Sequence, residues 1–369
     1  MKHLQAIILS ALVTLQMATA TEGEVFHPDP GDGHAGIQQI IDNHAPGVKI
    51  ILDSAVYKGS GIDLKGKNSI TIVGQNRAVG NTGSIIKLED NANTHLVRSS
   101  ASYSCYFENI TFDGNKANNS SGDAFYADGM WNTRFVGCSF RNAHGNGLTL
   151  ESKNGNADDM MTVRCRFNKN GGVGLYANSP AARHIYPNVG NNAEAGIFVP
   201  SGRTSVQVHG AQIYGNEGPA LKLGHISRCV FSSIHIEGAV TSKENRTRGI
   251  EITGGLKDTI IRDVVLVGNF STAVLVKPWA ASVDNCTIEN VKVHQGVSPS
   301  GKEPGAIQTG FKFDEPKSTI EGLVVSNCGT AAEGSFGEAA WDTNNISEGL
   351  TIKDCQGFVN KNRGDAEAS

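Results

Sequence analysis

A short phrase recurs along this chain: Gly or Ala, an apolar residue, any residue, and a second apolar residue. Successive copies start 22–29 residues apart, and no helix-length segment separates them. A repeat of this length is typical of a solenoid, whose coils bury their apolar side chains only against neighbouring coils. We therefore expect one elongated domain of stacked, short parallel strands. The copies begin at Ala124, Gly147, Gly174, Gly196, Ala220, Gly249 and Ala273.

The variable positions of the phrase are expected to form one outward-facing row. Successive side chains on a strand point to opposite faces, so the apolar pair points inward and its neighbours point outward. Stacking the coils aligns these outward side chains, and we look for function there. The outward residues that we expect to bind substrate are Tyr126, Asp128, Thr149, Glu151, Asn178, Phe198 and Lys277.

Other segments suit the turns and the end of such a solenoid. Ile37, Ile40 and Ile41 would share one face of a helix, which predicts an amphipathic N-terminal cap within residues 31–58. His144 and His184 are expected in turns. An Asn recurs four residues before the phrase, and because Asn tolerates left-handed backbone we expect a stacked turn ladder without chemistry. It occurs at Asn170, Asn192, Asn216 and Asn269.

The N-terminus predicts a secreted protein. Lys2 precedes an apolar stretch that ends before Ala18-Thr19-Ala20, so residues 1–20 are expected to be a signal peptide. Nothing later is long and apolar enough to predict a membrane span. We expect a single domain over 21–360 and a disordered tail over 361–369, whose residues are all small, polar or charged.

Composition narrows the class further. Forty-four Gly, with only 14 Phe and 3 Trp, suit a turn-rich β protein. A net charge of -4 without a basic block argues against nucleic acid as a partner. Seven cysteines cannot all pair, and the settings of Cys138 and Cys165 suggest that most cysteines pack as small buried hydrophobes. Possible glycosylation sites are Asn118, Asn119 and Asn245 foremost, then Asn109, Asn269 and Asn345.

The beginning of the chain carries a resemblance. Gly31-Asp32-Gly33, a short amphipathic helix, the segment 47–52 and Val56-Tyr57 precede coils rich in Gly-Asn and Gly-Ile-x-Ile. This order resembles the pectate-lyase superfamily. The resemblance implies an all-β fold, a single-stranded right-handed parallel β-helix with an N-terminal cap helix, in which the strand carrying the phrase often lines a saccharide groove. The Arg-x-Pro-x-x-Arg of classical pectate lyases, their acidic calcium cluster and the polygalacturonase signatures do not occur in context.

The outward row offers residues for β-elimination. This reaction needs positive charge to hold a developing enolate and a base for a carbon-bound proton. Lys222 with Arg248 suits the first role, and Tyr176, His225 or Lys222 the second; Glu251 completes the candidate catalytic set. Lyases of the alginate and chondroitin type use a Lys and an Arg from neighbouring coils, which this spacing resembles. A solvated ion pair between Lys222 and Glu251 is the plain structural alternative.

Three functions remain open at this stage. The leading one is a secreted carbohydrate-active enzyme that acts on an acidic polysaccharide by β-elimination or epimerisation. Hydrolysis would need a carboxylate pair such as Asp128 with Glu151. The second is a glycosylated secretory-route cyclase of the hetero-Diels–Alderase type, acting on a small apolar molecule. The third is a non-catalytic saccharide-binding protein. We expect no cofactor and no metal, and either a monomer or a side-by-side homo-oligomer.

Overall fold

The computed structural model describes the chain from residue 24 to residue 353, with gaps. The backbone alone is described in 307–313, 320–323, 329–330, 336–342 and 350–353. The predicted signal peptide and tail, together with Asn245, Asn269 and Asn345, lie outside the described residues. The described ranges are 24–76, 82–153, 158–238, 248–268, 270–277, 282–294, 307–313, 320–326, 328–330, 336–342 and 350–353.

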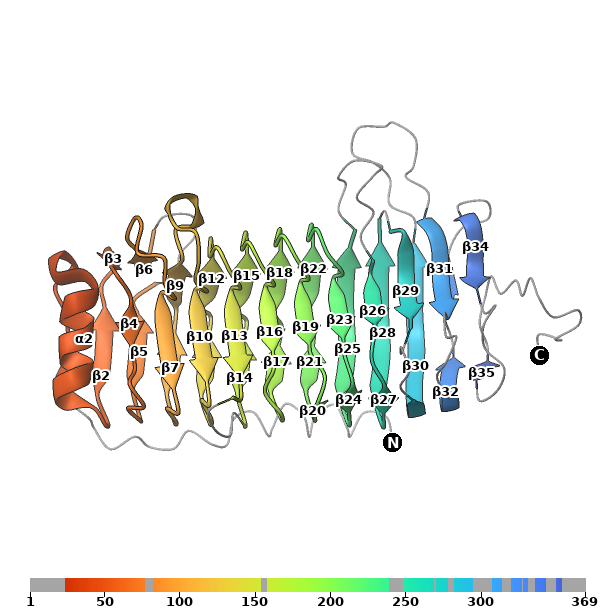
Figure 1. Cartoon of the computed structure of the whole chain (residues 1–369), viewed down its shortest axis with the longest axis horizontal. Coiled ribbons are helices and arrows are strands. Elements are labelled where there is room, and N and C mark those ends of the chain that lie inside the picture. The colour runs from red at the N-terminus through yellow and green to blue at the C-terminus, as the bar shows by residue number, and fades with distance from the viewer. Residues whose placement is uncertain are drawn as a thin grey trace, which may run out of the picture.

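The recurring phrase forms one face of a parallel β-solenoid, as the sequence predicts (Figure 1). Its strands stack into an eleven-stranded sheet of the described residues, here called the first sheet, and the register aligns the phrases of successive coils. The strands are β4 (Ile62–Asp63), β7 (Val97–Ser100), β10 (Phe125–Asp128), β13 (Leu148–Glu151), β16 (Leu175–Ala177), β19 (Ile197–Val199), β23 (Leu221–Leu223), β26 (Ile250–Ile252), β29 (Thr272–Val276), β31 (Ile307–Phe313) and β34 (Phe336–Asp342).

The remaining strands form a second parallel sheet that bends around the other sides of the solenoid. One column contains β1 (Val25–Phe26), β2 (Lys49–Leu52), β5 (Thr71–Gly74), β8 (Tyr106–Glu108), β11 (Arg134–Val136), β14 (Met161–Val163), β17 (Arg183–Ile185) and β21 (Gln207–His209). The next column contains β3 (Val56–Gly59), β6 (Ser84–Leu88), β9 (Ile110–Asp113), β12 (Ser139–Arg141), β15 (Arg166–Asn168), β18 (Asn188–Gly190) and β22 (Gln212–Tyr214).

Later coils join the two columns into longer strands. In β25, for example, the first half pairs with β21 and the second half with β22, and Ser233 at the bend has φ 56°. These strands are β25 (Val230–Glu237), β28 (Ile260–Val267) and β30 (Val283–His294). In the next coil β32 (Ile320–Ser326) pairs with the first part of β30 and β33 (Gly329–Thr330) with its last part, and β35 (Leu350–Lys353) pairs with β32. Short strands at a corner are β20 (Arg203–Thr204), β24 (Ile226–Ser227) and β27 (Leu256–Lys257).

A helix covers the N-terminal end of the stack (Figure 1). After the short 3-10 helix η1 (Pro30–Asp32), helix α2 (Gly33–His44) buries Ile37 and Ile41 completely and packs the half-buried Ile40 against the core. The open apolar end of a solenoid needs such a cover. The predicted cap helix is therefore confirmed. None of the described helices has the length and apolar character needed to cross a membrane.

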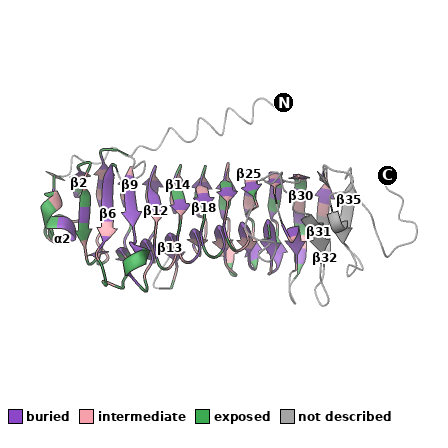
Figure 2. Cartoon of the chain, turned by 90° about the horizontal axis from the view of Figure 1, so that it is seen from above, coloured by how far each residue is buried: buried purple, intermediate pink, exposed green. Residues whose placement is uncertain are grey.

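Aromatic side chains stack from coil to coil inside the solenoid. The rings of Phe112, Phe140 and Phe167 lie parallel at 5.1 and 5.2 Å between centroids, and Phe107 stacks on Phe135 at 5.0 Å. All five rings are at most 1% exposed, and buried residues line the interior along its length (Figure 2). Each coil thus buries its apolar side chains against the next coil rather than in a separate core.

A buried ladder of asparagines fixes one turn of the solenoid. Asn170 Nδ2 donates to Asn192 Oδ1 at 2.9 Å, and Asn192 Nδ2 donates to Asn216 Oδ1 at 2.8 Å. The backbone N–H groups of Asn170 and Asn192 donate to the same oxygens. The amides thereby satisfy main-chain groups that would otherwise be buried without partners. The expected turn ladder is confirmed over these three residues.

Cysteine and histidine side chains complete the interior. The six described cysteines are all free and buried, so packing rather than bridging is confirmed for them. The prediction that His184 lies in a turn is wrong, because it sits within β17 and is fully buried, with Nδ1 2.9 Å from Thr162 Oγ1. Burial lowers the pKa of His184 to about 3, which keeps the ring neutral.

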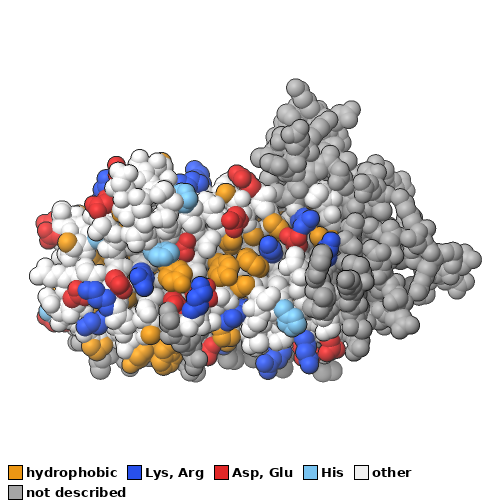
Figure 3. Space-filling model, in the orientation of Figure 1, with side chains coloured by type: hydrophobic (Ala, Val, Ile, Leu, Met, Phe, Trp, Pro, Cys, Tyr) orange, Lys and Arg blue, Asp and Glu red, His pale blue; other side chains and the backbone are white. Residues whose placement is uncertain are grey.

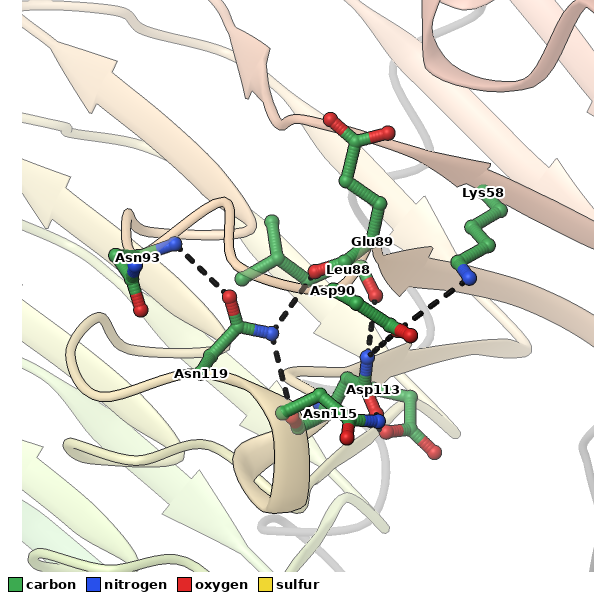
Figure 4. A network of polar contacts seen from close by, with 9 residues as sticks. Lys58, Leu88, Glu89, Asp90, Asn93, Asp113, Asn115 and Asn119 are labelled. Atoms are coloured by element: carbon green, nitrogen blue, oxygen red, sulfur yellow. Dashed lines mark hydrogen bonds and ion pairs between the residues drawn. The ribbon is translucent and has the colours of Figure 1, made fainter.

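The loop that contains two predicted glycosylation sites is tied down by hydrogen bonds (Figure 4). Around the 3-10 helix η2 (Lys116–Asn118), Asn119 is 6% exposed, and its Nδ2 donates to the carbonyls of Glu89 and Asn115. Asn118 is exposed and its Nδ2 makes one hydrogen bond, to Asn115 Oδ1, whereas Asn119 is buried. Of the two, Asn118 is therefore the side chain that this fold leaves accessible to a sugar.

Candidate functional site

The outward side chains of the first sheet form one row in register. Tyr126 pairs with Thr149, Thr149 with Tyr176, Tyr176 with Phe198, Phe198 with Lys222 and Lys222 with Glu251. Adjacent strands lie about 4.8 Å apart, so neighbouring members can contact the same ligand. Figure 3 shows hydrophobic side chains flanked by acidic and basic ones along this face.

Two carboxylates lie at the ends of adjacent strands of this row. Asp128 and Glu151 are register partners and are 4% and 6% exposed. Glu151 accepts a hydrogen bond from Asn178 Nδ2, and Lys153 Nζ lies 3.3 Å from its Oε2. The backbone N–H of Lys153 donates to Asp128 Oδ1 at 2.9 Å. Lys153 thus holds both carboxylates beside the row.

The two tyrosines of the row are kept as neutral phenols. Burial, and then the nearby charge of Asp128, raise the pKa of Tyr126 above its usual value. Burial followed by the charge of Glu151 does the same to the pKa of Tyr176. Both effects disfavour the phenolate. At neutral pH, therefore, Tyr126 and Tyr176 are proton donors placed next to carboxylates.

His95, which the sequence analysis did not single out, supports Tyr126. The two rings stack at 4.5 Å between centroids with an interplanar angle of 19°. Asp123 N donates to His95 Nδ1 at 3.0 Å, so the neutral ring carries its proton on Nε2. Burial lowers the pKa of His95, partly offset by the charge of Asp123. His95 therefore holds Tyr126 in place and presents an N–H donor of its own.

Thr149 and Asp123 link this group to the next coil. Thr149, predicted to bind substrate, is only 3% exposed, and its hydroxyl donates to Asp123 Oδ2 at 2.7 Å. The N–H of Asn146 donates to Asp123 Oδ1 at 2.7 Å. The hydroxyl of Thr149 thus donates within the protein rather than to a substrate, and the residue helps to hold Asp123 in position.

Positive charge gathers near the tyrosines from segments outside the recurring phrase. Arg98 pairs in register with Tyr126 and is exposed. Arg203 lies near Tyr176, whose pKa its charge lowers slightly, and its Nη1 donates to Ser152 Oγ at 2.7 Å. Arg203 Nε and Asn178 Oδ1 are buried without a protein hydrogen bond among the described residues. Each is a buried polar atom whose missing partner an ordered water or a ligand would supply.

The residues predicted to be catalytic are only partly brought together. Lys222 Nζ lies 5.0 Å from the centroid of the Phe198 ring, and Arg248 Nη1 forms an ion pair with the 6% exposed Glu251. Lys222 and Glu251 are register neighbours, so the expected cross-coil arrangement is present, but the described partner of Glu251 is Arg248. His225 lies in the turn after β23.

The environment of His225 and Lys277 places them at the edge of the row. His225 N donates to Ser201 Oγ at 3.0 Å, and a Cβ on Gly255 would lie 2.9 Å from the His225 ring. Lys277 follows β29, and its N–H donates to the carbonyl of Ile252. Within the described residues, no group of three or more His, Cys, Asp or Glu side chains is arranged to hold a metal ion.

Comparisons with known proteins agree with this architecture. The family described as "Right handed beta helix region" matches residues 102–232 and 154–307. No curated protein sequence matches the chain. Among solved structures, the chain is similar to the mannuronan C-5 epimerase A-module of Azotobacter vinelandii, with 15% identity over 87% of this chain and 90% of that chain and a TM-score of 0.63.

Two further solved structures share the fold. An endo-xylogalacturonan hydrolase from Aspergillus tubingensis is 12% identical over 90% of this chain and 100% of that one, with a TM-score of 0.59. A polygalacturonase from Erwinia carotovora is 11% identical over 92% and 100%, with a TM-score of 0.56. Because the overlapping family matches cover more than half of its length, the chain belongs to the right-handed β-helix family.

Proposed function

We propose that the protein is a carbohydrate-active enzyme that binds an acidic polysaccharide along the outward row of the first sheet and acts on it by proton abstraction next to a uronate carboxylate. One observation carries the proposal: Tyr126 and Tyr176 project from nearby coils beside the nearly buried Glu151, with Lys153 paired to that carboxylate. The similar structures named above include an enzyme that epimerises mannuronan.

The charges around the tyrosines suit a uronate. Lys153 and Arg203 would bind the substrate carboxylate, and this pairing acidifies the carbon-bound hydrogen beside it. Glu151 would then accept that proton. The electron pair forms a double bond in the sugar ring, and the glycosidic C–O bond breaks. The phenol of Tyr126 supplies a proton to the departing oxygen.

Epimerisation shares the first step. The enolate would take a proton back on the opposite face, and Tyr176 is the second neutral phenol of the row. Lys222 lies two coils further along from Tyr176, with its ammonium nitrogen 5.0 Å from the centroid of the Phe198 ring. We therefore place Lys222 at a neighbouring sugar, as a partner for its carboxylate, rather than at the reacting carbon.

A double-bond assay with matched variants tests the proposal. Wild-type protein on a panel of uronic polysaccharides should give rising ultraviolet absorbance from the conjugated product, or solvent deuterium at the inverted carbon. Tyr126→Phe and Glu151→Gln should lower kcat by about 10²-fold or more. Tyr106→Phe, which removes an outward phenol from β8 on the second sheet, should leave kcat unchanged.

Two results would overturn this function. New reducing ends without a double bond would establish hydrolysis, for which Asp128 and Glu151 are the candidate carboxylate pair. If wild-type protein changes none of the polysaccharides, the proposal that the first sheet abstracts a proton from a uronate is wrong.

A further inference from the structure

A cleft opens on the second sheet, away from the row of tyrosines. It has a volume of about 480 Å³ and is lined by Gln212, Ile213, Tyr214, His235 and Glu237. This volume lies within the range of small-molecule sites. The cleft lies on β22 and the second half of β25. Figure 2 shows β18 and β25 on the side of the solenoid opposite β13, so a ligand in this cleft would not occupy the first sheet.

The polar lining comes from register partners on two adjacent strands. Gln212 pairs with His235 and Tyr214 with Glu237, while Ile213 and Ile236 between them point inward and are buried. Because alternate side chains share a face, all four polar groups point outward together. The strand pairing itself therefore holds the lining in place.

The ring of Tyr214 is fixed by the preceding coil. It lies over Gly190, where any Cβ would come within 2.4 Å of Tyr214 Cε2, and its hydroxyl donates to Asn188 Oδ1 at 3.0 Å. Asn188 Nδ2 in turn donates to Gln212 Oε1 at 3.1 Å. A glycine at 190 is needed to leave room for the ring. The aromatic surface and the Gln212 amide are thus oriented before any ligand arrives.

The chemistry of the lining identifies the class of ligand. His235 Nε2 lies 3.1 Å from Glu237 Oε1, and no Lys or Arg is among the lining residues, all of which the structure describes. An amide, an imidazole and a carboxylate bind hydroxyl groups, and a fixed phenol ring packs against the C–H face of a sugar. The carboxylate of Glu237 disfavours a uronate. The next coil continues the surface with the half-buried Val265 and Val267.

We propose that this cleft is a second saccharide-binding site, which takes a neutral oligosaccharide. Arg98 and Lys222 stand in the outward row of the first sheet, and Lys153 and Arg203 lie near its Tyr176, whereas the described lining of the cleft has a carboxylate and no Lys or Arg. The row therefore suits an anionic chain and the cleft a neutral one. The inference stands on the cleft alone and does not depend on the reaction at the first sheet. The protein would bind a neutral glycan in the cleft on the second sheet while the outward row of the first sheet stays accessible to its substrate.

Calorimetric titration of the full chain with neutral and anionic oligosaccharides tests the site. The probes are cellohexaose, xylohexaose and mannohexaose, with an oligogalacturonate as the anionic comparison. Wild type should bind at least one neutral probe, and Tyr214→Ala should weaken that binding about tenfold, because the variant lacks the ring face on which the sugar packs. Gly190→Ala should weaken it as well by displacing the ring. Tyr186→Ala, which truncates a 52% exposed tyrosine outside the cleft, should have no effect.

A second variant protects the test against loss of fold. Glu237→Gln keeps the shape of the side chain. The variant should bind the neutral probe more weakly than wild type does, while its thermal unfolding temperature stays that of wild type. The proposal is overturned if no neutral probe binds to wild type, if only the oligogalacturonate binds, or if Tyr214→Ala and Tyr186→Ala bind alike.

Discussion

Replacement of Asn192 by Ala should strongly destabilise the solenoid. The side chain is fully buried and makes four hydrogen bonds: its Oδ1 accepts from Asn170 N and Nδ2, and its Nδ2 donates to Phe167 O and Asn216 Oδ1. In the variant, Asn170 Nδ2 retains the Phe140 carbonyl, and Asn216 Oδ1 retains the Asn192 N–H. The buried N–H of Asn170 loses its acceptor.

The magnitude follows from these partners. A buried donor left unsatisfied costs about 1–3 kcal/mol, and each further bond contributes about 0.5–1.5 kcal/mol net. With about 2 kcal/mol for the Asn170 N–H and about 1 kcal/mol for each of the three further bonds, the expected loss in the free energy of unfolding is about 5 kcal/mol. Asn118→Ala is the matched control, because Asn118 is exposed and its Nδ2 donates only to Asn115 Oδ1 among the described partners. That change should cost less than about 0.5 kcal/mol.

Urea unfolding followed by circular dichroism measures both variants. Asn192→Ala should lower the midpoint while the slope stays unchanged, which marks a change in stability rather than in the unfolded state. A loss below about 1 kcal/mol, or one equal to that of Asn118→Ala, would refute the view that the ladder stabilises the turn by satisfying buried main-chain groups.

Three further predictions follow from the core and the row. His184 has a pKa of about 3 in the fold against 6.5 unfolded, so it should contribute a fall in the free energy of unfolding of about 1.4 kcal/mol per pH unit as pH drops below 6.5. His34, whose pKa burial lowers to about 4, adds a slope of the same sign. Urea titrations at several pH values should therefore show a slope that is reduced, but not abolished, in His184→Gln. Phe140→Ala removes a fully buried ring stacked on two others and should cost about 3–5 kcal/mol in the same assay, whereas a cost below about 1 kcal/mol would contradict the stack. Lys222→Ala should raise KM on a uronic polysaccharide and leave kcat near wild type; a large fall in kcat would place Lys222 at the reacting carbon.

The coil register could be predicted because the recurring phrase ties each small residue to an inward apolar pair. The row from Tyr126 to Glu251 therefore appears as expected. The recurring phrase did not predict the coil that contains His95, because Leu96 occupies the position that is Gly or Ala in the other copies. The same coil still pairs in register through β7 and places His95 against Tyr126.

Side chains from turns could not be placed from the sequence. Lys153 follows β13 and Arg203 lies in the short corner strand β20 of a later coil, 50 residues apart, and only the turns after the recurring phrase bring both near Tyr176. Periodicity likewise marked Thr149 as outward without showing that Asp123 would engage its hydroxyl. The repeat therefore predicts which face of a strand a side chain lies on, whereas its contacts depend on residues in the turns, which the repeat does not predict.

The location of a bound substrate tests the central claim most directly. We would determine the structure of the Glu151→Gln variant, which should bind substrate and turn it over much more slowly than wild type, with an oligouronate of the polymer that wild type acts on. The account predicts sugar rings along the outward row of the first sheet, with a carboxylate at Lys153 or Arg203 and a phenol oxygen of Tyr126 beside a glycosidic oxygen. An oligouronate bound elsewhere on the solenoid, with this row unoccupied, would contradict it.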